Sequence, residues 1–372
     1  MTDSSLTFLE NLCNSFGPSG FERDPIKLTR DYVQPFTTDL KVDKLGSLLF
    51  FKNGTASSPQ ILLPGHVDEV GFIVNGINDK GFITFLQLGG WFDQVLLGQR
   101  VLIRTRKGDL EGIIAAKPPH LLPPEERKKV VEKSKMFIDI GCSNKQEVEA
   151  MGVRMGDPIM PVSKFSVTEK PVYEEEVQKG NMKLAIGKAF DDRIGAFIAA
   201  EIVRILSTES IAHPNTIIGA ATTQEEVGIR GARTAAWLAE PDVCITLEVD
   251  IAGDVPGIEA TEAPAVLGKG PSILTFDASL IPNQGLKELI IQTAEKHQIK
   301  YQLSSMARGA TDAGAIHIAR AGCPSIVIGV PTRHIHSHVG ILSLEDVENC
   351  IRLLVEVVQL LDQETVDNFT KV

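Results

Sequence analysis

Residues 186–193 read Ile-Gly-Lys-Ala-Phe-Asp-Asp-Arg, residues 222–226 read Thr-Thr-Gln-Glu-Glu, and residues 247–250 read Leu-Glu-Val-Asp. Each of these three acidic clusters follows or ends an apolar, strand-like run. Carboxylates that are brought together repel one another and resist ionisation unless a positive charge lies among them. A divalent metal ion is the usual source of that charge in proteins. The sequence therefore predicts a metal site around which the rest of the chain is organised.

Charge counting favours two metal ions over one. Asp191, Glu226 and Glu248 supply three negative charges, and Glu225 supplies a fourth. Two divalent cations would balance these charges, whereas one ion would leave two carboxylates without a counter-charge in the cleft. The pair Glu225-Glu226 is the most informative motif, because neighbouring side chains diverge. Two adjacent glutamates share a site only if one ligates metal and the other moves protons.

Histidine ligands are available beyond two other strand-like runs. His66 follows one run, and His334, His336 and His338 alternate in a loop after another, where at most one is expected to be a ligand. Open α/β sheets place their sites at the carboxyl ends of strands, where these residues would meet the acidic clusters. Asp68, two residues beyond His66, would accept the ring proton and fix the tautomer for metal binding.

Several of these motifs also have a simpler structural interpretation. Asp191-Asp192 precedes a helix, as helix-capping acids do. Glu248 at the end of a strand could simply reach solvent, and a single His-x-Asp motif is typical of polar loops. The prediction of a metal site therefore depends on the motifs occurring together in one chain.

The pattern of apolar residues predicts an α/β fold with a mixed sheet flanked by helices and an inserted, small, all-β, barrel-like domain. Short strands separated by glycines fill the middle of the chain, whereas helices and strands alternate on either side. The expected domains are residues 1–72 and 166–372, which together form the α/β part, and residues 73–165, which form the insert. A chain of 372 residues is long enough for two domains. In the second α/β part we expect helices at 194–206, 231–238, 285–298, 311–321 and 343–361, and strands at 216–222, 243–249 and 324–330.

Composition excludes several classes of function. The net charge of −11 argues against nucleic acid as a partner, and no apolar run is long enough to cross a membrane. The N-terminal residues lack the basic and apolar regions of a secretory signal, so none is expected. The five cysteines are scattered and have no CxxC spacing, which favours a reducing cytoplasm.

The sequence resembles peptidase family M42, the dinuclear metallo-aminopeptidases that include the tetrahedral and glutamyl aminopeptidases. The resemblance extends over essentially the whole chain, and its motifs occur in the family's order. The matching stretches are 65–71 (Gly-His-Val-Asp-Glu-Val-Gly), 188–193 (Lys-Ala-Phe-Asp-Asp-Arg), 223–228 (Thr-Gln-Glu-Glu-Val-Gly), 252–257 (Ala-Gly-Asp-Val-Pro-Gly) and 331–337 (Pro-Thr-Arg-His-Ile-His-Ser).

The resemblance implies a role for each site residue. It implies metal ligation by His66, Asp191, Glu226, Glu248 and His336, with Asp191 bridging two ions. Glu225 matches the general base, and Asp68 matches the partner of His66. The family usually has aspartate at position 248, so Glu248 is a departure, and Asp250 is the second candidate there.

The resemblance also implies a zinc-peptidase-like fold and an activity. We expect two divalent metal ions per subunit, zinc first and cobalt or manganese as alternatives, and release of N-terminal residues from short peptides. The side-chain preference is expected to be acidic or broad, and Arg308 is the candidate that would meet an acidic residue. The insert would be a dimerisation domain, and homodimers would assemble into a hollow dodecamer.

Three other functions are compatible with these motifs. A glycoside hydrolase with two catalytic carboxylates is one alternative, although only 6% of residues are aromatic and sugar clefts are usually aromatic. A metal-dependent deacylase would use similar ligands on substrates without a free N-terminus. A non-catalytic protein with a vestigial metal site would have no need of Glu225.

Overall fold

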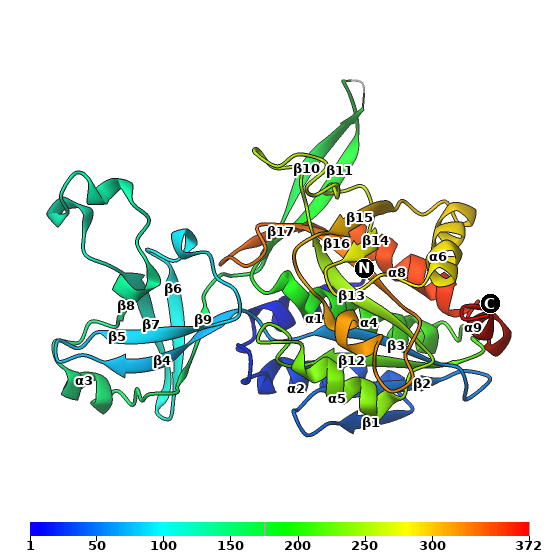
Figure 1. Cartoon of the computed structure of the whole chain (residues 1–372), viewed down its shortest axis with the longest axis horizontal. Coiled ribbons are helices and arrows are strands. Elements are labelled where there is room, and N and C mark those ends of the chain that lie inside the picture. The colour runs from blue at the N-terminus through cyan, green and yellow to red at the C-terminus, as the bar shows by residue number, and fades with distance from the viewer. Residues whose placement is uncertain (175, 372) are drawn as a thin grey trace.

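The computed structural model describes residues 1–174 and 176–371. It has a large α/β body, and beside it lies a smaller β-barrel (Figure 1). The predicted fold class, an α/β protein with an inserted all-β barrel, is confirmed. Within the described residues, no helix combines the length and apolar character that crossing a bilayer requires.

The body is built on one large mixed sheet, to which eleven strands of the described residues belong. Two of them lie beside the main path: β14 (Ser272–Asp277) pairs with β16 and with β15 (Gln302–Met306). The main path runs in the order β1 (Asp39–Val42), β2 (Leu48–Asn53), β12 (Thr216–Thr222), β3 (Gln60–His66), β13 (Val243–Ile251), β16 (Ser325–Arg333), β17 (Gly340–Ser343), β11 (Val177–Gly187) and β10 (Ser166–Glu174).

The barrel is inserted between β3 and β10 of the body. Its six strands close in the order β4 (Gly71–Ile77), β5 (Ile83–Leu88), β8 (Phe137–Asp139), β7 (Gly108–Ala115), β6 (Arg100–Thr105) and β9 (Pro158–Pro161). The body is therefore made from both ends of the chain. The exact domain limits, 1–72, 73–165 and 166–372, stay predictions.

Helices cover both faces of the large sheet. One group packs against α4 on one face, and α5 and α7 pack on the other. The helices are α1 (Asp3–Asn14), α2 (Arg23–Val33), α3 (Lys145–Ala150) in the insert, α4 (Phe190–Thr208), α5 (Arg230–Ala239), α6 (Gln284–Lys296), α7 (Asp312–Ile316), α8 (Leu344–Val358) and α9 (Gln363–Asn368).

Strand alternation explains why both faces need cover. Leu48 and Phe50 of β2 enter the core beneath α4, while Leu49 and Phe51 enter the core beneath α5. Successive side chains of a strand point to opposite faces, so four consecutive apolar residues bury on two sides. Strands β12, β3, β13 and β16 are parallel to their neighbours in this series, so their carboxyl ends share one edge.

Two elements differ from the sequence predictions. The helix expected at 311–321 ends at Ile316, and the chain continues in tighter turns, in which the amide of Ala319 donates to the carbonyl of Ile316 and the amide of Gly322 to that of Ala319. The hairpin of β10 and β11 was not predicted, and it projects from the body (Figure 1). Polar residues occupy both faces of its outer part, so the sequence lacks the alternation that marks a half-buried strand.

Candidate metal centre

The predicted site residues come from four parallel strands and from the start of one helix. His66 is the last residue of β3, and its register partner on β12 is Thr222, which directly precedes the loop of Glu225 and Glu226. Glu248 lies on β13 between β3 and β16. His336 follows β16, and Asp191 lies at the start of α4. The parallel arrangement therefore brings residues far apart in sequence to one edge of the sheet.

Asp191 is the centre of the cluster. Its Oδ1 lies 3.2 Å from Nε2 of His66, and its Oδ2 lies 3.3 Å from Nε2 of His336. Each histidine also faces one glutamate: Oε2 of Glu225 is 3.8 Å from His66, and Oε2 of Glu226 is 3.8 Å from His336. One carboxylate thus lies between two imidazoles, as a ligand shared by two ions must.

Glu248 and Asp250 occupy different places. Glu248 is buried and offers a carboxylate oxygen within 4.8 Å of ligand atoms of His66 and Asp192. A second group with the same spacing is formed by His66, Asp191 and Glu226. Asp250, two residues further along β13, belongs to neither group. The structure therefore brings Glu248, and not Asp250, to the cluster.

These donors fit divalent metal ions. Imidazole nitrogens and carboxylate oxygens are ligands that zinc and neighbouring divalent metals accept. Oε1 of Glu226 is buried and has no hydrogen-bond partner among the described residues. A buried carboxylate oxygen without a partner is costly, and a bound cation would satisfy it. The cluster could thus hold metal, as the sequence predicts.

The pKa values of the two glutamates are raised because the cluster gathers several buried carboxylates. Burial raises the pKa of Glu225 to about 9; the nearby His66 opposes this shift, and the neighbouring acids Asp312 and Glu226 add to it. Burial and Asp191 raise the pKa of Glu226 to about 8. Without metal these glutamates are therefore protonated at neutral pH, and metal binding must release their protons.

The two histidines titrate in the opposite sense to ordinary buried histidines. Burial alone would lower the pKa of His336, but its contacts with Asp191, Glu226 and the Gly90 carbonyl together raise it to about 10. Burial would also lower the pKa of His66, but the acids around it, Asp191 and Asp68 first, together raise it. Both rings therefore carry the positive charge that an ion would otherwise supply.

His66 is fixed in place through its ring and through its backbone. Its Nδ1 lies 3.0 Å from the main-chain carbonyl of Asp68 and 3.6 Å from the carboxylate Oδ1 of the same residue. A proton on Nδ1 would leave Nε2 free to ligate metal. The His66 amide donates to Oδ2 of Asp192, whose Oδ1 accepts from Gly195 in α4. Asp192 therefore caps the helix, while its neighbour Asp191 faces the cluster.

The Asp68 carboxylate binds the loop that carries the two glutamates. Its Oδ1 accepts the amide of Glu225 at 2.9 Å, and its Oδ2 accepts the amide of Glu226 at 3.2 Å and the hydroxyl of Ser19 at 2.6 Å. Asp68 thus links the end of β3, the N-terminal segment and the loop that contains Glu225 and Glu226. These contacts could not be read from the sequence, because the partners are main-chain groups and a serine 49 residues away.

A buried ion network supports the start of α4. Nζ of Lys188 lies 2.7 Å from Glu69, and the Arg193 guanidinium lies 3.1 Å from the same carboxylate. Arg193 also donates to the main-chain carbonyls of Val67 and Leu12. The network joins α1, the residues after β3 and α4 directly beside the cluster. Lys188 and Arg193 lie in the matched family motif, but their structural role needed the coordinates.

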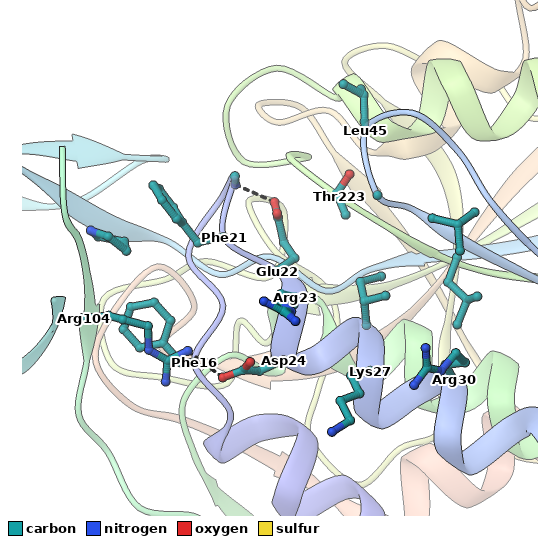
Figure 2. Close-up of a pocket in the computed structure, with 16 residues that line it drawn as sticks. Phe16, Phe21, Glu22, Arg23, Asp24, Lys27, Arg30, Leu45, Arg104 and Thr223 are labelled. Carbon is teal, nitrogen blue, oxygen red and sulfur yellow. Dashed lines mark hydrogen bonds and ion pairs between the residues drawn. The ribbon is translucent and has the colours of Figure 1, made fainter. Parts of the chain in front are cut away.

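Residues of the loop 223–226 line two different cavities. A cavity of about 370 Å³ is lined by His66, Asp191, Glu225 and Glu248 together with Arg308. A larger cavity of about 890 Å³ is lined by residues of α2 and by Thr223, and none of the cluster residues lines it (Figure 2). Of these two cavities, the smaller one is lined by groups of the cluster.

Comparison with known proteins identifies the family. The family model of the M42 glutamyl aminopeptidases matches residues 46–353. The glutamyl aminopeptidase of Lactococcus lactis subsp. cremoris strain MG1363 is 33% identical over 355 residues, which cover 94% of each chain.

Two solved structures share the fold over nearly the whole chain. The TET aminopeptidase from the marine sediment archaeon Thaumarchaeota archaeon SCGC AB-539-E09 is 55% identical, with a TM-score of 0.93 and 99% of each chain covered. The structure of PhTET1-12s, a dodecamer in its asymmetric unit, is 29% identical, with a TM-score of 0.81 and coverage of 97% of this chain and 100% of that one. The chain therefore belongs to the M42 aminopeptidase family and is a hydrolase of the peptidase class.

Proposed function

We propose that this aminopeptidase removes N-terminal residues from short peptides at a two-metal centre, with Glu225 as general base. Asp191 would bridge the ions; His66 and Glu248 would complete one side, and Glu226 and His336 the other. The main support for this proposal is the position of Asp191 between two imidazoles, each of which faces one glutamate. Zinc is the first candidate for the ions, with cobalt and manganese next.

The chemistry follows from the positions of the side chains. Divalent ions at this centre supply a Lewis acid for the scissile carbonyl and lower the pKa of water toward about 7. Glu225 would have a lower pKa beside bound cations, and it would then be ionised and able to accept a proton. Glu225 takes the proton from the attacking water and returns it to the nitrogen of the leaving group. A carboxylate beside the site whose charge is not balanced by metal would bind the free α-amine of the substrate.

An acidic residue is the proposed first choice at the cleaved N-terminus. Arg308 lines the cavity beside the cluster and makes no ion pair with the described residues. Met306, Ile251 and Ile335 line the same cavity, so Arg308 is its one basic side chain apart from the histidines. An arginine there would attract a glutamyl or aspartyl side chain and disfavour a lysyl one. A broad preference is the alternative.

Replacement of Glu225 by glutamine tests the proposed role. The amide has the same size but cannot accept the proton, so we expect kcat to fall by about 10²- to 10⁴-fold while two equivalents of metal stay bound. The measurement combines hydrolysis of aminoacyl-nitroanilides with metal analysis of the purified variant. Glu209→Gln, an exposed residue, serves as control. Near-normal kcat in Glu225→Gln would refute the assignment.

Self-association is proposed together with catalysis. The relative PhTET1-12s is a dodecamer, and the barrel of this chain carries exposed apolar residues, among them Leu86 and Ile113. Apolar side chains on the outside of a domain mark interaction surfaces when they gather. We therefore propose that the barrel is the dimerisation domain and that dimers build a larger shell.

The five free cysteines fit a cytoplasmic location. The glycosidase and deacylase alternatives are not favoured by the family assignment.

A further inference from the structure

The loop 223–229, which carries Glu225 and Glu226, has a backbone that must be held from outside. Gln224 and Ile229 both adopt left-handed conformations, with φ of 58° and 54°. Such a conformation costs a residue with a side chain about 1–2 kcal/mol. It persists only where surrounding groups fix it. The position of Glu225 therefore depends on the contacts of its own backbone neighbours.

Three consecutive amides of this loop donate to two buried carboxylates. The amides of Glu225 and Glu226 donate to Asp68, as described above. The amide of Gln224 donates to Oε1 of Glu22 at 3.1 Å, and the same oxygen accepts the amide of Gly20 at 2.6 Å. Asp68 fixes the two residues that do the chemistry, whereas Glu22 fixes the left-handed residue just before them.

Glu22 is well placed to hold the loop but not to touch the substrate. It is 5% exposed and lines the larger cavity together with Thr223, and that cavity has none of the cluster residues in its wall (Figure 2). The hydrogen bond from the Gly20 amide orients its carboxylate, and burial, with a smaller effect of the nearby Asp68, raises its pKa to about 7. The hydrogen bond from the Gln224 amide joins Glu22 to the loop, so we expect its influence on the reaction to pass through that amide.

We infer that Glu22 is a positioning residue, which sets the place of Glu225 through its hydrogen bond to the Gln224 amide. Without an acceptor at position 22, that part-buried amide loses its partner, and full burial would make this loss cost about 1–3 kcal/mol. The adjoining cavity gives the loop room to move and regain a partner. A displacement of about 1 Å at a catalytic group can cost about 100-fold in rate. The inference rests on the proposed role of Glu225.

Two variants of similar size separate positioning from simple packing. Glu22→Gln keeps a carbonyl oxygen that can accept from Gln224, so we expect kcat within about 3-fold of the wild type. Glu22→Leu keeps the bulk but has no acceptor, and kcat should fall about 10- to 100-fold with KM nearly unchanged. Two equivalents of metal should remain in both variants, because no ligand is altered. Asp24→Leu, in the same cavity wall and paired with Arg104, is the control and should keep kcat.

A double-mutant cycle with Glu225→Gln completes the test. If Glu22 acts through Glu225, adding Glu22→Leu to Glu225→Gln should lower kcat little further. Equal kcat in Glu22→Leu and wild type, or full additivity in the double variant, would overturn the inference while leaving the role of Glu225 intact. If Glu225→Gln itself kept normal kcat, the proposed function and the inference would both fall.

Discussion

At the scale of single residues, substitution of Arg308 tests which of the two proposed specificities holds. It lies in the cavity beside Glu225 and its charge is free to meet a substrate. We expect Arg308→Met to lower kcat/KM for glutamyl-nitroanilide about 10- to 100-fold, since a charge-assisted hydrogen bond contributes about 1.5–3 kcal/mol. The value for leucyl-nitroanilide should change less than 3-fold.

A charge reversal sharpens this comparison. Arg308→Glu should favour lysyl-nitroanilide over glutamyl-nitroanilide, because the sign of the charge at the cavity wall is inverted. Arg233→Met, at an exposed position on α5, removes the same charge away from the cavity and serves as control. If all three substrates lost activity equally in Arg308→Met, the residue would support the loop and the acidic preference would be wrong.

Titration of the cluster residues gives a second prediction at this scale. Glu225 and Glu226 have pKa values of about 9 and about 8 in the metal-free fold, against an ordinary value of 4.5. Between pH 4.5 and these raised pKa values, the folded chain binds more protons than the unfolded chain. The free energy of unfolding therefore falls as pH rises through this range. His336, raised to about 10, acts in the same direction: its stabilisation is complete below its ordinary pKa and is lost as pH rises through 10.

The Tm of the metal-free protein should therefore fall between pH 6 and pH 9. Excess zinc should raise Tm more at pH 9 than at pH 6, because protons compete with the ion for the same groups. Thermal unfolding of chelator-treated protein, with and without zinc, measures both effects. In Glu225→Gln the decline with pH should be shallower, since one titrating group is gone. A Tm that is independent of pH in the metal-free protein would contradict the proton-loaded cluster.

At the scale of elements, the contact between β3 and α4 joins fold and site. Gly65 of β3 lies against α4, where a Cβ would come within 2.3 Å of the Ala196 nitrogen. Gly65→Ala must therefore push apart the strand that ends in His66 and the helix that begins beside Asp191. We expect a loss of about 3 kcal/mol in the free energy of unfolding, measured by urea denaturation, and weaker metal binding.

Gly187→Ala in β11 is the matched control for this substitution. The atoms nearest to a Cβ at Gly187 are 3.4 Å away or more, so alanine should fit there at little cost. Unfolding free energies that were equal in the two variants would show that the close approach of β3 and α4 does not constrain the fold.

Elements with a clear apolar pattern could be predicted from the sequence, and elements without one could not. The apolar run of β12 is buried along its whole length, and the helix expected at 343–361 is α8, where Ser343 is the N-cap and its Oγ accepts the amide of Asp346. The β10–β11 hairpin lacked such a signal. At the site, motifs indicated the charged side chains, but the contacts of Glu22 join residues about 200 positions apart and run to backbone amides. Every residue except proline has a backbone amide N–H, so the sequence does not show which amide a carboxylate will bind.

At the scale of the whole molecule, the exposed apolar residues of the barrel test the proposed assembly. Leu86 on β5 is 55% exposed and Ile113 on β7 is 48% exposed, and both strands pair with β8. If this surface is covered by a second copy, Leu86→Glu combined with Ile113→Glu places charges in an apolar interface, where they are strongly destabilising. We expect a shift from the large assembly to monomers, measured by light scattering after size-exclusion chromatography.

The control for assembly uses exposed apolar residues outside the barrel. Leu303→Glu combined with Ile318→Glu adds the same two charges to the body, at residues that are 50% and 68% exposed. Because the barrel is proposed as the dimerisation domain, this pair should leave the mass of the assembly unchanged. Dissociation by the control pair alone would move the dimer contact to the body. Unchanged mass in the barrel variant would remove the barrel from the assembly, while the metal centre, which one chain completes, would be unaffected.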